Sequence, residues 1–341
     1  MQPAMSDIST TADGVVENFT NSSQFSGLKE VIEFDVVRNV FYPCRDIALF
    51  FLVFSGNALV LLSILKTRNL QTCTNYMLAS LSCADMLVSI CSLLNFFKWI
   101  HRFNWLQLSV NYCIVAMFLY VVSLTSSMYH LIAISFDRFL STRWPIKYRT
   151  CRTTSHTVVI VCVIWFLSVA TAMPTIFVTN TTNCSFETFF RKAHVLMLGC
   201  IMLSADFIIV FVYGLIGCSK RRQRRRVAGM VAAVDETFQQ RQENKSTKLL
   251  LKISLVFIVC WTPLGVSCIM LKYTTETFES WFYPIRAVFL FLAASNSFMN
   301  PIIYCWNSQT FRAAFKRLLC GRCTCSPRST NIVTLTNGTS F

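Results

Sequence analysis

Seven long apolar stretches divide this sequence, and they constrain its fold more than any other feature. They cover residues 47–66, 74–98, 111–142, 153–178, 193–218, 247–271 and 284–306. Each has at least the roughly 20 residues that a helix needs to cross a bilayer. Only 14% of the 341 residues are charged, well below the roughly 25% typical of soluble domains. The sequence therefore predicts an all-α membrane protein, a bundle of seven transmembrane helices.

Clusters of basic residues predict the orientation of this bundle. They follow the first, third, fifth and seventh stretches: Lys66 and Arg68; Arg143, Lys147, Arg149 and Arg152; Lys220, Arg221, Arg222, Arg224, Arg225 and Arg226; Arg312, Lys316, Arg317 and Arg322. Cytoplasmic loops are rich in Lys and Arg, so we expect a plasma-membrane protein with its N-terminus outside and its C-terminus in the cytoplasm. The net charge of +15 then reflects topology, and we do not expect nucleic acid as a partner.

The chain is expected to have four parts. An extracellular tail, 1–40, precedes the membrane domain, 41–307, and residues 320–341 form a cytoplasmic tail. Residues 308–319 lie between them, with apolar side chains at helical spacing on one face and basic side chains on the other: Phe311, Phe315, Leu318 and Leu319 against Arg312, Lys316 and Arg317. This pattern predicts an amphipathic helix that lies along the membrane surface and contacts lipids.

Several residues are candidates for covalent modification. Sequons predict glycosylation on the outer side, at Asn18, Asn21, Asn180 and Asn183. Cys113 and Cys184 both face an oxidising compartment, so we expect a disulfide between them. Cys320, Cys323 and Cys325 follow the amphipathic segment. We favour their palmitoylation over a metal site, because no fourth ligand lies nearby.

One carboxylate lies deep within the second stretch. An ionised Asp85 at this depth must pair, bind a cation or take up a proton. Candidate partners at similar depth come from three other stretches: Asn57, Ser127, Asn296, Ser297 and Asn300. These oxygen atoms suit a sodium ion, but they equally suit a hydrogen-bonded network that only joins helices. The sequence leaves these two interpretations open.

The order of short motifs resembles that of the rhodopsin-like (class A) G-protein-coupled receptors over all seven stretches. The matching motifs are Gly56-Asn57-Ala58-Leu59-Val60, Leu81-Ser82-Cys83-Ala84-Asp85, Asp137-Arg138-Phe139, Trp165, Phe257, Cys260-Trp261-Thr262-Pro263 and Asn300-Pro301-Ile302-Ile303-Tyr304. The third of these has Phe where the family has Tyr. The resemblance implies a receptor that acts on a heterotrimeric G protein and is not itself an enzyme.

The resemblance also implies roles for individual residues in switching. Arg138 would pair with Asp137 and with Glu243 at rest. Pro263 and Pro301 interrupt helical hydrogen bonding, and Pro263 would let the sixth helix swing outward. Four aromatic residues would respond to this movement: Phe257 and Trp261 as a packed pair beneath the ligand, and Tyr213 and Tyr304 as partners of Arg138 in the active state.

The fifth stretch departs from the family pattern. Ala205 stands where the family usually has Pro, and Asp206 follows it. The helical bulge expected at that proline is therefore in doubt. Asp206 is an unusual carboxylate at this depth, and the sequence leaves open whether it hydrogen-bonds inward or is simply protonated.

The expected ligand pocket is defined partly by what it lacks. The Lys that holds retinal in opsins would fall at Ala294, and the Asp that pairs with amines would fall at Tyr120. The residues expected to line the pocket are Tyr120, Leu124, Trp261, Lys98 and Arg286. The outer rim is expected to be basic overall, with Lys98, His101, Arg102, Arg191, Lys192, Lys272 and Arg286 against Glu187, Glu276 and Glu279. This balance favours a peptide or an acidic lipid as ligand, with a nucleoside-like or other small non-peptide ligand as the alternative.

Two other classes of membrane protein fit the sequence less well. A transporter would show internal repeats or paired broken helices, and a membrane enzyme would show a metal or paired-acid motif at one depth. We find neither in the sequence. Beyond the candidate sodium ion we expect no cofactor.

Overall fold

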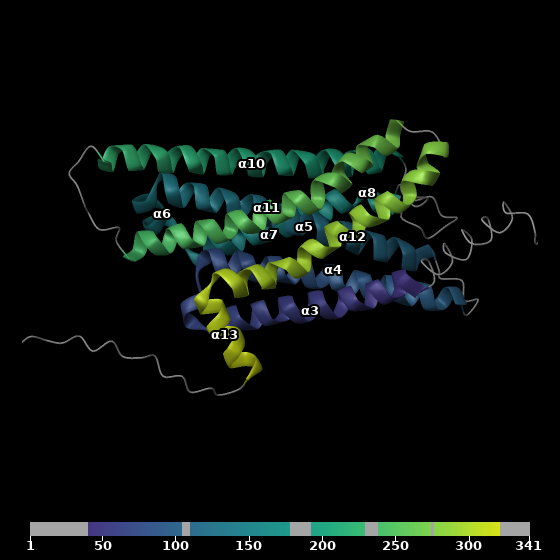
Figure 1. The fold of residues 1–341 in the computed structure, drawn as a ribbon, viewed down its shortest axis with the longest axis horizontal. Coiled ribbons are helices and arrows are strands. Elements are labelled where there is room, and N and C mark those ends of the chain that lie inside the picture. Colours follow the sequence, from purple (N-terminus) through teal and green to yellow (C-terminus); the bar gives the residue numbers. More distant parts are fainter. Residues whose placement is uncertain (1–39, 104–109, 178–191, 229–237, 274–275, 321–341) are drawn as a thin grey trace, which may run out of the picture.

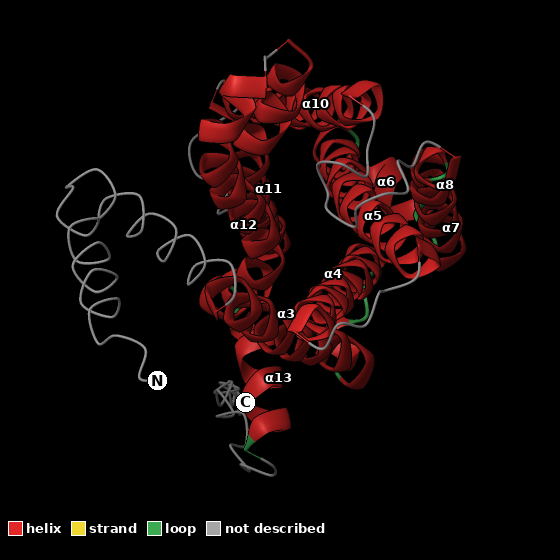
Figure 2. Ribbon diagram, turned by 90° about the vertical axis from the view of Figure 1, so that its right-hand side faces the viewer, coloured by secondary structure: helices red, strands yellow, loops and turns green. Residues whose placement is uncertain are grey.

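The computed structural model describes residues 40–103, 110–177, 192–228, 238–273 and 276–320. Within these ranges, seven helices are long and apolar enough to cross a membrane. They are α3 (Tyr42–Lys66), α4 (Cys73–Phe103), α5 (Val110–Arg143), α7 (Thr154–Ala172) with its continuation α8 (Pro174–Phe177), α10 (Lys192–Ala228), α11 (Phe238–Tyr273) and α12 (Glu276–Asn307). They run side by side along one axis (Figure 1), and an end-on view shows the bundle (Figure 2). The predicted all-α seven-helix bundle is confirmed.

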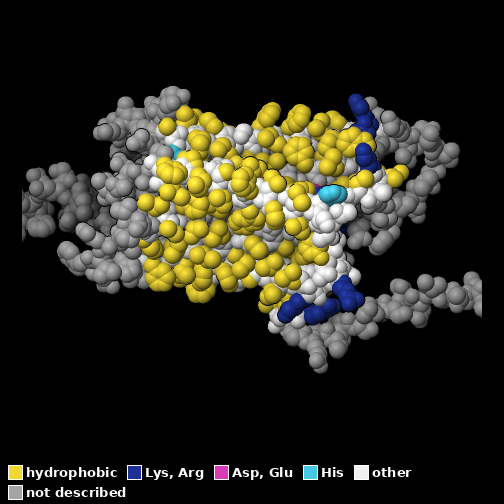
Figure 3. Space-filling model, turned by 180° about the vertical axis from the view of Figure 1, so that it is seen from behind, with side chains coloured by type: hydrophobic (Ala, Val, Ile, Leu, Met, Phe, Trp, Pro, Cys, Tyr) yellow, Lys and Arg dark blue, Asp and Glu magenta, His cyan; other side chains and the backbone are white. Residues whose placement is uncertain are grey.

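The surface of the bundle is apolar along most of its length. Large side chains point outward in the middle of the helices, and Phe51, Phe166 and Phe207 are 62%, 72% and 71% exposed. Figure 3 shows this apolar band, with Lys and Arg side chains gathered toward one end. Burying so much apolar surface requires lipid around the molecule. Below, the end of the bundle where α5 ends and α13 begins is called the Arg138 end.

The fourth predicted stretch does not form one unbroken helix. The sequence predicts a span over 153–178, whereas α7 ends at Ala172 and α8 starts at Pro174. Pro174 has no backbone N–H to donate, so it cannot continue the hydrogen bonding of the preceding turn. Together the two helices still cover the length of one span, Thr154–Phe177.

The fifth helix resolves the doubt raised by its missing proline. α10 is helical throughout, and no break or bulge occurs beside Ala205. Its basic extension, which includes residues 220–226, continues to Ala228. The sixth helix, α11, likewise begins well before its apolar stretch, at Phe238.

Two short helices connect the spans at the Arg138 end. The 3-10 helix η2 (Arg68–Leu70) follows α3, and α6 (Pro145–Cys151) follows α5. The sequence analysis did not predict α6. Its start is typical of a short helix, because Pro145 occupies the first turn, where a missing N–H costs nothing.

A final helix, α13 (Gln309–Leu319), turns away from α12 and packs against α3. Ser308 caps it by accepting a hydrogen bond from the N–H of Phe311. Phe311 and Phe315 are 2% and 6% exposed, whereas Leu319 is 72% exposed. The two Phe side chains therefore fix α13 to the bundle. Its position at the membrane surface stays a prediction.

Candidate functional site

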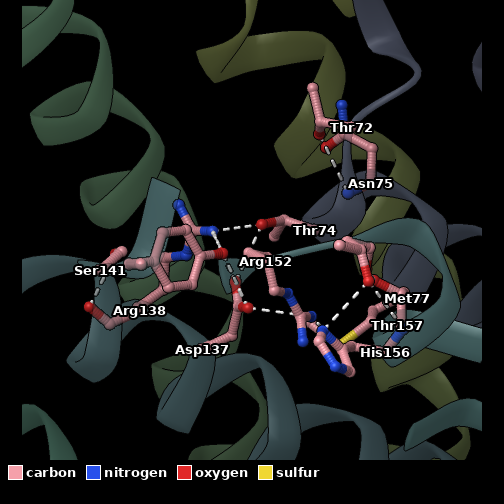
Figure 4. A network of polar contacts seen from close by, with 12 residues as sticks. Thr72, Thr74, Asn75, Met77, Asp137, Arg138, Ser141, Arg152, His156 and Thr157 are labelled. Carbon is pink, nitrogen blue, oxygen red and sulfur yellow. Dashed lines mark hydrogen bonds and ion pairs between the residues drawn. The ribbon is translucent and has the colours of Figure 1, made fainter. Parts of the chain in front are cut away.

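The Arg138 end holds a buried ion pair between neighbours on α5. Arg138 Nη2 lies 2.6 Å from Asp137 Oδ2. Thr74 of α4 bridges the pair, because its hydroxyl donates to Asp137 Oδ2 over 2.9 Å and accepts from Arg138. Figure 4 shows the three side chains together. The structure thus brings together Asp137 and Arg138, as the family resemblance implies, and adds Thr74.

The other oxygen of Asp137 has two further partners. The hydroxyl of Tyr148, on α6, donates to Oδ1 over 2.8 Å, and Arg152 Nη2 lies 3.0 Å from the same atom. Burial, and next the charge of Asp137, raise the pKa of Tyr148, so its hydroxyl remains a donor at neutral pH. The sequence analysis missed Tyr148 and Arg152 as ligands of Asp137. The only signal was their place just after the Asp137-Arg138 motif.

Three further residues were predicted to take part in the switch: Glu243, Tyr213 and Tyr304. Glu243 lies in α11, but its side chain is outside the described part of the structure, so its contact with Arg138 stays a prediction. Ser254 donates to the hydroxyl of Tyr213 over 3.3 Å. Tyr304 is fully buried and stacks on Phe311 with 5.1 Å between ring centroids.

The middle of the bundle is organised around Asp85. Ser127 and Ser297 donate to its Oδ1 over 3.0 and 2.8 Å, and Asn300 donates to its Oδ2 over 2.8 Å. Three helices thus converge on one fully buried carboxylate. Of the candidate partners, Ser127, Ser297 and Asn300 contact Asp85 directly.

The other two candidates, Asn57 and Asn296, are buried as well. Asn57 donates to the backbone carbonyls of Val53 and Ser297, over 3.0 and 2.9 Å, instead of to Asp85. Asn296 is 1% exposed. Within the described residues, three buried amide oxygens have no hydrogen-bond partner: the Oδ1 atoms of Asn57, Asn296 and Asn300. Buried acceptors of this kind normally bind a water molecule or an ion. These oxygen atoms, with the carboxylate of Asp85, are therefore suitable ligands for a hydrated cation.

Two aromatic side chains of α11 pack against each other near its proline. The rings of Phe257 and Trp261 stack with centroids 5.6 Å apart, and both side chains are buried. Pro263 lies two residues further, inside α11. On α12, Pro301 fits against Gly56 so closely that a Cβ there would lie 3.0 Å from the proline Cγ. Only glycine allows this approach without displacement of a neighbour.

A second polar cluster joins three helices and was not predicted. Ser80 of α4 receives the indole N–H of Trp165 over 3.1 Å and lies 2.8 Å from Nε2 of His130. Nδ1 of His130 is 2.7 Å from the carbonyl of Ser126. The sequence singled out Trp165 as a family match, but gave no signal for Ser80. The cluster is structural, because its polar atoms satisfy one another.

The residues predicted for the ligand pocket belong to the part of the bundle away from the Arg138 end. Trp261 and Leu124 are buried, and Tyr120 is partly buried. Arg286 is 5% exposed. The side chain of Lys98 lies outside the described residues. An ion pair that the sequence analysis missed, Arg45–Asp46 on α3 at 2.6 Å, also lies in this part of the bundle.

The predicted modification sites are only partly described. Cys113 is disulfide-bonded, and its expected partner, Cys184, lies outside the described residues. Cys320 is exposed at the end of α13 and is free. The remaining sites also fall outside the described residues: Asn18, Asn21, Asn180, Asn183, Cys323 and Cys325.

Comparison with known proteins shows which family and which receptors this chain resembles. The family described as "7 transmembrane receptor (rhodopsin family)" matches residues 56–304. The RYamide receptor of Drosophila melanogaster is 28% identical over 293 residues, which cover 80% of this chain and 62% of the relative. The tachykinin-like peptides receptor 86C of the same species is 27% identical over 297 residues, 80% of this chain and 57% of the relative.

A third relative has a different kind of name. Trace amine-associated receptor 9 of Rattus norvegicus is 27% identical over 308 residues, which cover 84% of this chain and 88% of the relative. By contrast, the chain spans only about three fifths of the length of the two insect receptors, 62% of one and 57% of the other. All three likenesses run through most of the membrane bundle.

Proposed function

The chain belongs to the rhodopsin family of seven-transmembrane receptors, and from this premise we propose that it converts the binding of an extracellular peptide into nucleotide exchange on a heterotrimeric G protein. It is a multi-pass plasma-membrane receptor and not an enzyme. The ligand and the G protein are the parts that we propose.

The observation that carries the proposal is the buried Asp137–Arg138 pair. The guanidinium of Arg138 contacts the carboxylate of Asp137 and the hydroxyls of Thr74 and Tyr148. Burying this charge in an apolar bundle would be strongly unfavourable without these contacts. Such a group is suited to a switch, because its release creates a new contact surface at the end of the bundle. We propose that this end faces the cytoplasm, as the basic residues of α10 and α13 support.

Support for a peptide ligand comes from two directions. The names of the two insect relatives refer to peptides. A charged, buried Arg286 at the outer end suits an acidic group such as a peptide C-terminus. An amine is the second candidate because of the trace amine relative. Tyr120 counts against it, since it stands where amine receptors are expected to have Asp. An acidic lipid or a nucleoside-like ligand remains an outcome of the ligand screen.

We also propose that Asp85 binds a sodium ion together with Ser127, Asn296 and Asn300. The support is the buried carboxylate of Asp85 together with Asn300, which bonds to it and has an unpartnered amide oxygen, and the equally unpartnered amide oxygen of Asn296. When bound, sodium supplies a positive charge that compensates Asp85 and holds the third and seventh helices together. The competing interpretation is that the hydrogen bonds from Ser127, Ser297 and Asn300 alone join the helices.

The proposed outer and inner surfaces carry the expected modifications. We propose glycans on the N-terminal tail and on the segment that contains Asn180 and Asn183, and a disulfide between Cys113 and Cys184. At the inner surface we propose palmitoylation at Cys320 and its two neighbours, beside the lipid contacts of α13. The exposed thiol of Cys320 at the end of α13 supports that position.

A guanine-nucleotide exchange assay tests the proposed function. The full chain would be reconstituted in lipid nanodiscs with purified heterotrimers of each G-protein class and screened with peptides, amines and acidic lipids. We expect a peptide to accelerate exchange on at least one heterotrimer, and Arg138→Ala to abolish that response while peptide binding persists. A response to amines alone would overturn the peptide proposal, and exchange that is unaffected by Arg138→Ala would overturn the role of the pair.

A further inference from the structure

A carboxylate outside the family pattern lies between the fifth and sixth helices. Asp206, in the middle of α10, is 6% exposed, whereas the next residue, Phe207, is 71% exposed on the lipid side. The carboxylate therefore faces the bundle. Thr262 of α11 donates to its Oδ2 over 2.9 Å. Its Oδ1 is buried and has no hydrogen-bond partner among the described residues.

The position of Thr262 makes this contact relevant to movement. Thr262 lies between Trp261 and Pro263 in α11. Pro263 cannot donate a backbone hydrogen bond, and its ring disturbs the preceding turn, so α11 bends most easily at this level. The Asp206–Thr262 bond thus ties the fifth helix to the bending point of the sixth.

The same face of α10 shows how the two helices are held on either side of this bond. Gly199, Asp206 and Tyr213 are spaced by seven residues, which places them on one face of a helix. At Gly199, the backbones are so close that a Cβ would lie 2.9 Å from the carbonyl oxygen of Gly265. At Tyr213, the described contact with α11 is a hydrogen bond of 3.3 Å from the hydroxyl of Ser254. The two helices are thus in close backbone contact on one side of Asp206 and are joined through side chains on the other.

We propose that Asp206 is a positioning residue whose hydrogen bond to Thr262 holds the sixth helix in its resting position against the fifth. If the part of α11 that precedes Pro263 moved away from α10, Asp206 would lose its one described partner between two apolar helices. An acceptor left unsatisfied there is costly, so the bond opposes the movement. This inference rests on the proposed function only for the meaning of that movement, and the bond can be tested without ligand or G protein.

Hydrogen–deuterium exchange of the full chain in lipid nanodiscs measures the effect directly. Thr262→Val removes the donor while keeping the side-chain volume nearly unchanged. We expect roughly five- to tenfold faster amide exchange in the stretch of α11 from Thr247 to Trp261, the factor expected from losing one buried hydrogen bond. Asp206→Leu should accelerate the same peptides, and the double variant should be no faster than the faster single variant.

Conservative variants separate the hydrogen bond from packing. Thr262→Ser and Asp206→Asn keep a donor and an acceptor and should exchange like the parent chain. Ser204→Ala is the matched control on α10, because among the described residues its hydroxyl donates to the carbonyl of Ile201 in its own helix. Parent-like exchange in Thr262→Val would overturn the proposal. So would a Thr262→Ser variant as fast as Thr262→Val, or acceleration in α4 equal to that in α11. Failure of nucleotide exchange with every G protein would contradict the proposed function but leave this result intact.

Discussion

Tyr148 donates its hydroxyl proton to Asp137 over 2.8 Å from a short helix that lies outside the membrane spans. The bond links the segment between the third and fourth helices to the carboxylate that also holds Arg138. Each oxygen of Asp137 therefore has its own partners, with Arg138 and Thr74 at Oδ2 and Tyr148 and Arg152 at Oδ1. The resting pair is part of a network and not an isolated contact.

Replacing Thr74 should weaken the resting pair. Thr74→Val removes the hydroxyl that bonds to both Asp137 and Arg138 while keeping the side-chain shape. A loss of about 1 kcal/mol should raise the population of the active state several-fold. We expect higher ligand-free nucleotide exchange at matched surface expression. Thr72→Val is the control, because in the described part of the chain the Thr72 hydroxyl accepts from the backbone N–H of Asn75 and does not contact the pair. An equal increase in both variants would refute the bridge.

Replacing Arg152 should lower ligand-free nucleotide exchange, the opposite of the effect expected for Thr74→Val. Arg152 and Arg138 share one carboxylate, so Arg152→Gln leaves the full charge of Asp137 to Arg138 and should lower ligand-free exchange. The assay is the same nucleotide exchange measurement, carried out in a Thr74→Val background so that a decrease can be detected. An increase would show that Arg152 supports the pair instead of competing with it.

The disulfide at Cys113 should be needed for surface expression or ligand binding. Cys113→Ser and Cys184→Ser should each reduce surface expression or ligand binding, and the double variant should be no worse than either single variant. Closing a loop of this size contributes about 2–4 kcal/mol. Peptide mapping of the mature protein under non-reducing conditions checks the linkage, and two free thiols would exclude it. Cys44→Ser is the control, because Cys44 is exposed and free.

Sodium should stabilise the parent chain through Asp85. In nanodiscs, replacing N-methylglucamine by sodium at ten times its dissociation constant should add about 1.4 kcal/mol of stability and raise the melting temperature by a few degrees. Asp85→Asn should remove this dependence. A parent chain whose melting temperature is the same with both cations would leave only the hydrogen-bonded network, and potassium serves as a further control for specificity.

Glu243 is the expected partner of Arg138 on the sixth helix. Glu243→Ala should raise ligand-free exchange and, by linkage, tighten agonist binding, since both report the same shift toward the active state. The neighbouring Lys245→Ala, a charge change on the exposed surface of α11, should leave both unchanged. Unchanged basal exchange in Glu243→Ala would show that a contact between Arg138 and Glu243 does not hold the resting state.

The sequence was sufficient to predict the fold because the membrane imposes it. A helix in lipid must satisfy its backbone internally and needs a minimum apolar length, so seven stretches predict seven helices with little ambiguity. The break between Ala172 and Pro174 was less visible, since the apolar stretch continues through it. The helix α6 was missed because it lies outside the membrane, where apolar length gives no signal.

The site was predictable where a residue type is unexpected at its depth. Asp85, Asp137 and Asp206 are costly in an apolar stretch, so each is noticeable in the sequence. Their partners are ordinary Ser, Thr and Tyr residues, and only the packing of helices shows that Thr74 meets Asp137 and Thr262 meets Asp206. Asn57 was assigned to Asp85 by depth alone, whereas its side chain bonds to the backbone of the seventh helix.

The most direct test of the central claim is ligand-free nucleotide exchange on purified heterotrimers with the parent chain, Asp137→Asn and Arg138→Ala at equal receptor density. Asp137→Asn removes the charge that holds Arg138, so it should exceed the parent chain on at least one heterotrimer. Arg138→Ala should fall to the level of empty nanodiscs. If Asp137→Asn and Arg138→Ala both matched the parent chain on every heterotrimer, the buried pair would not control G-protein coupling.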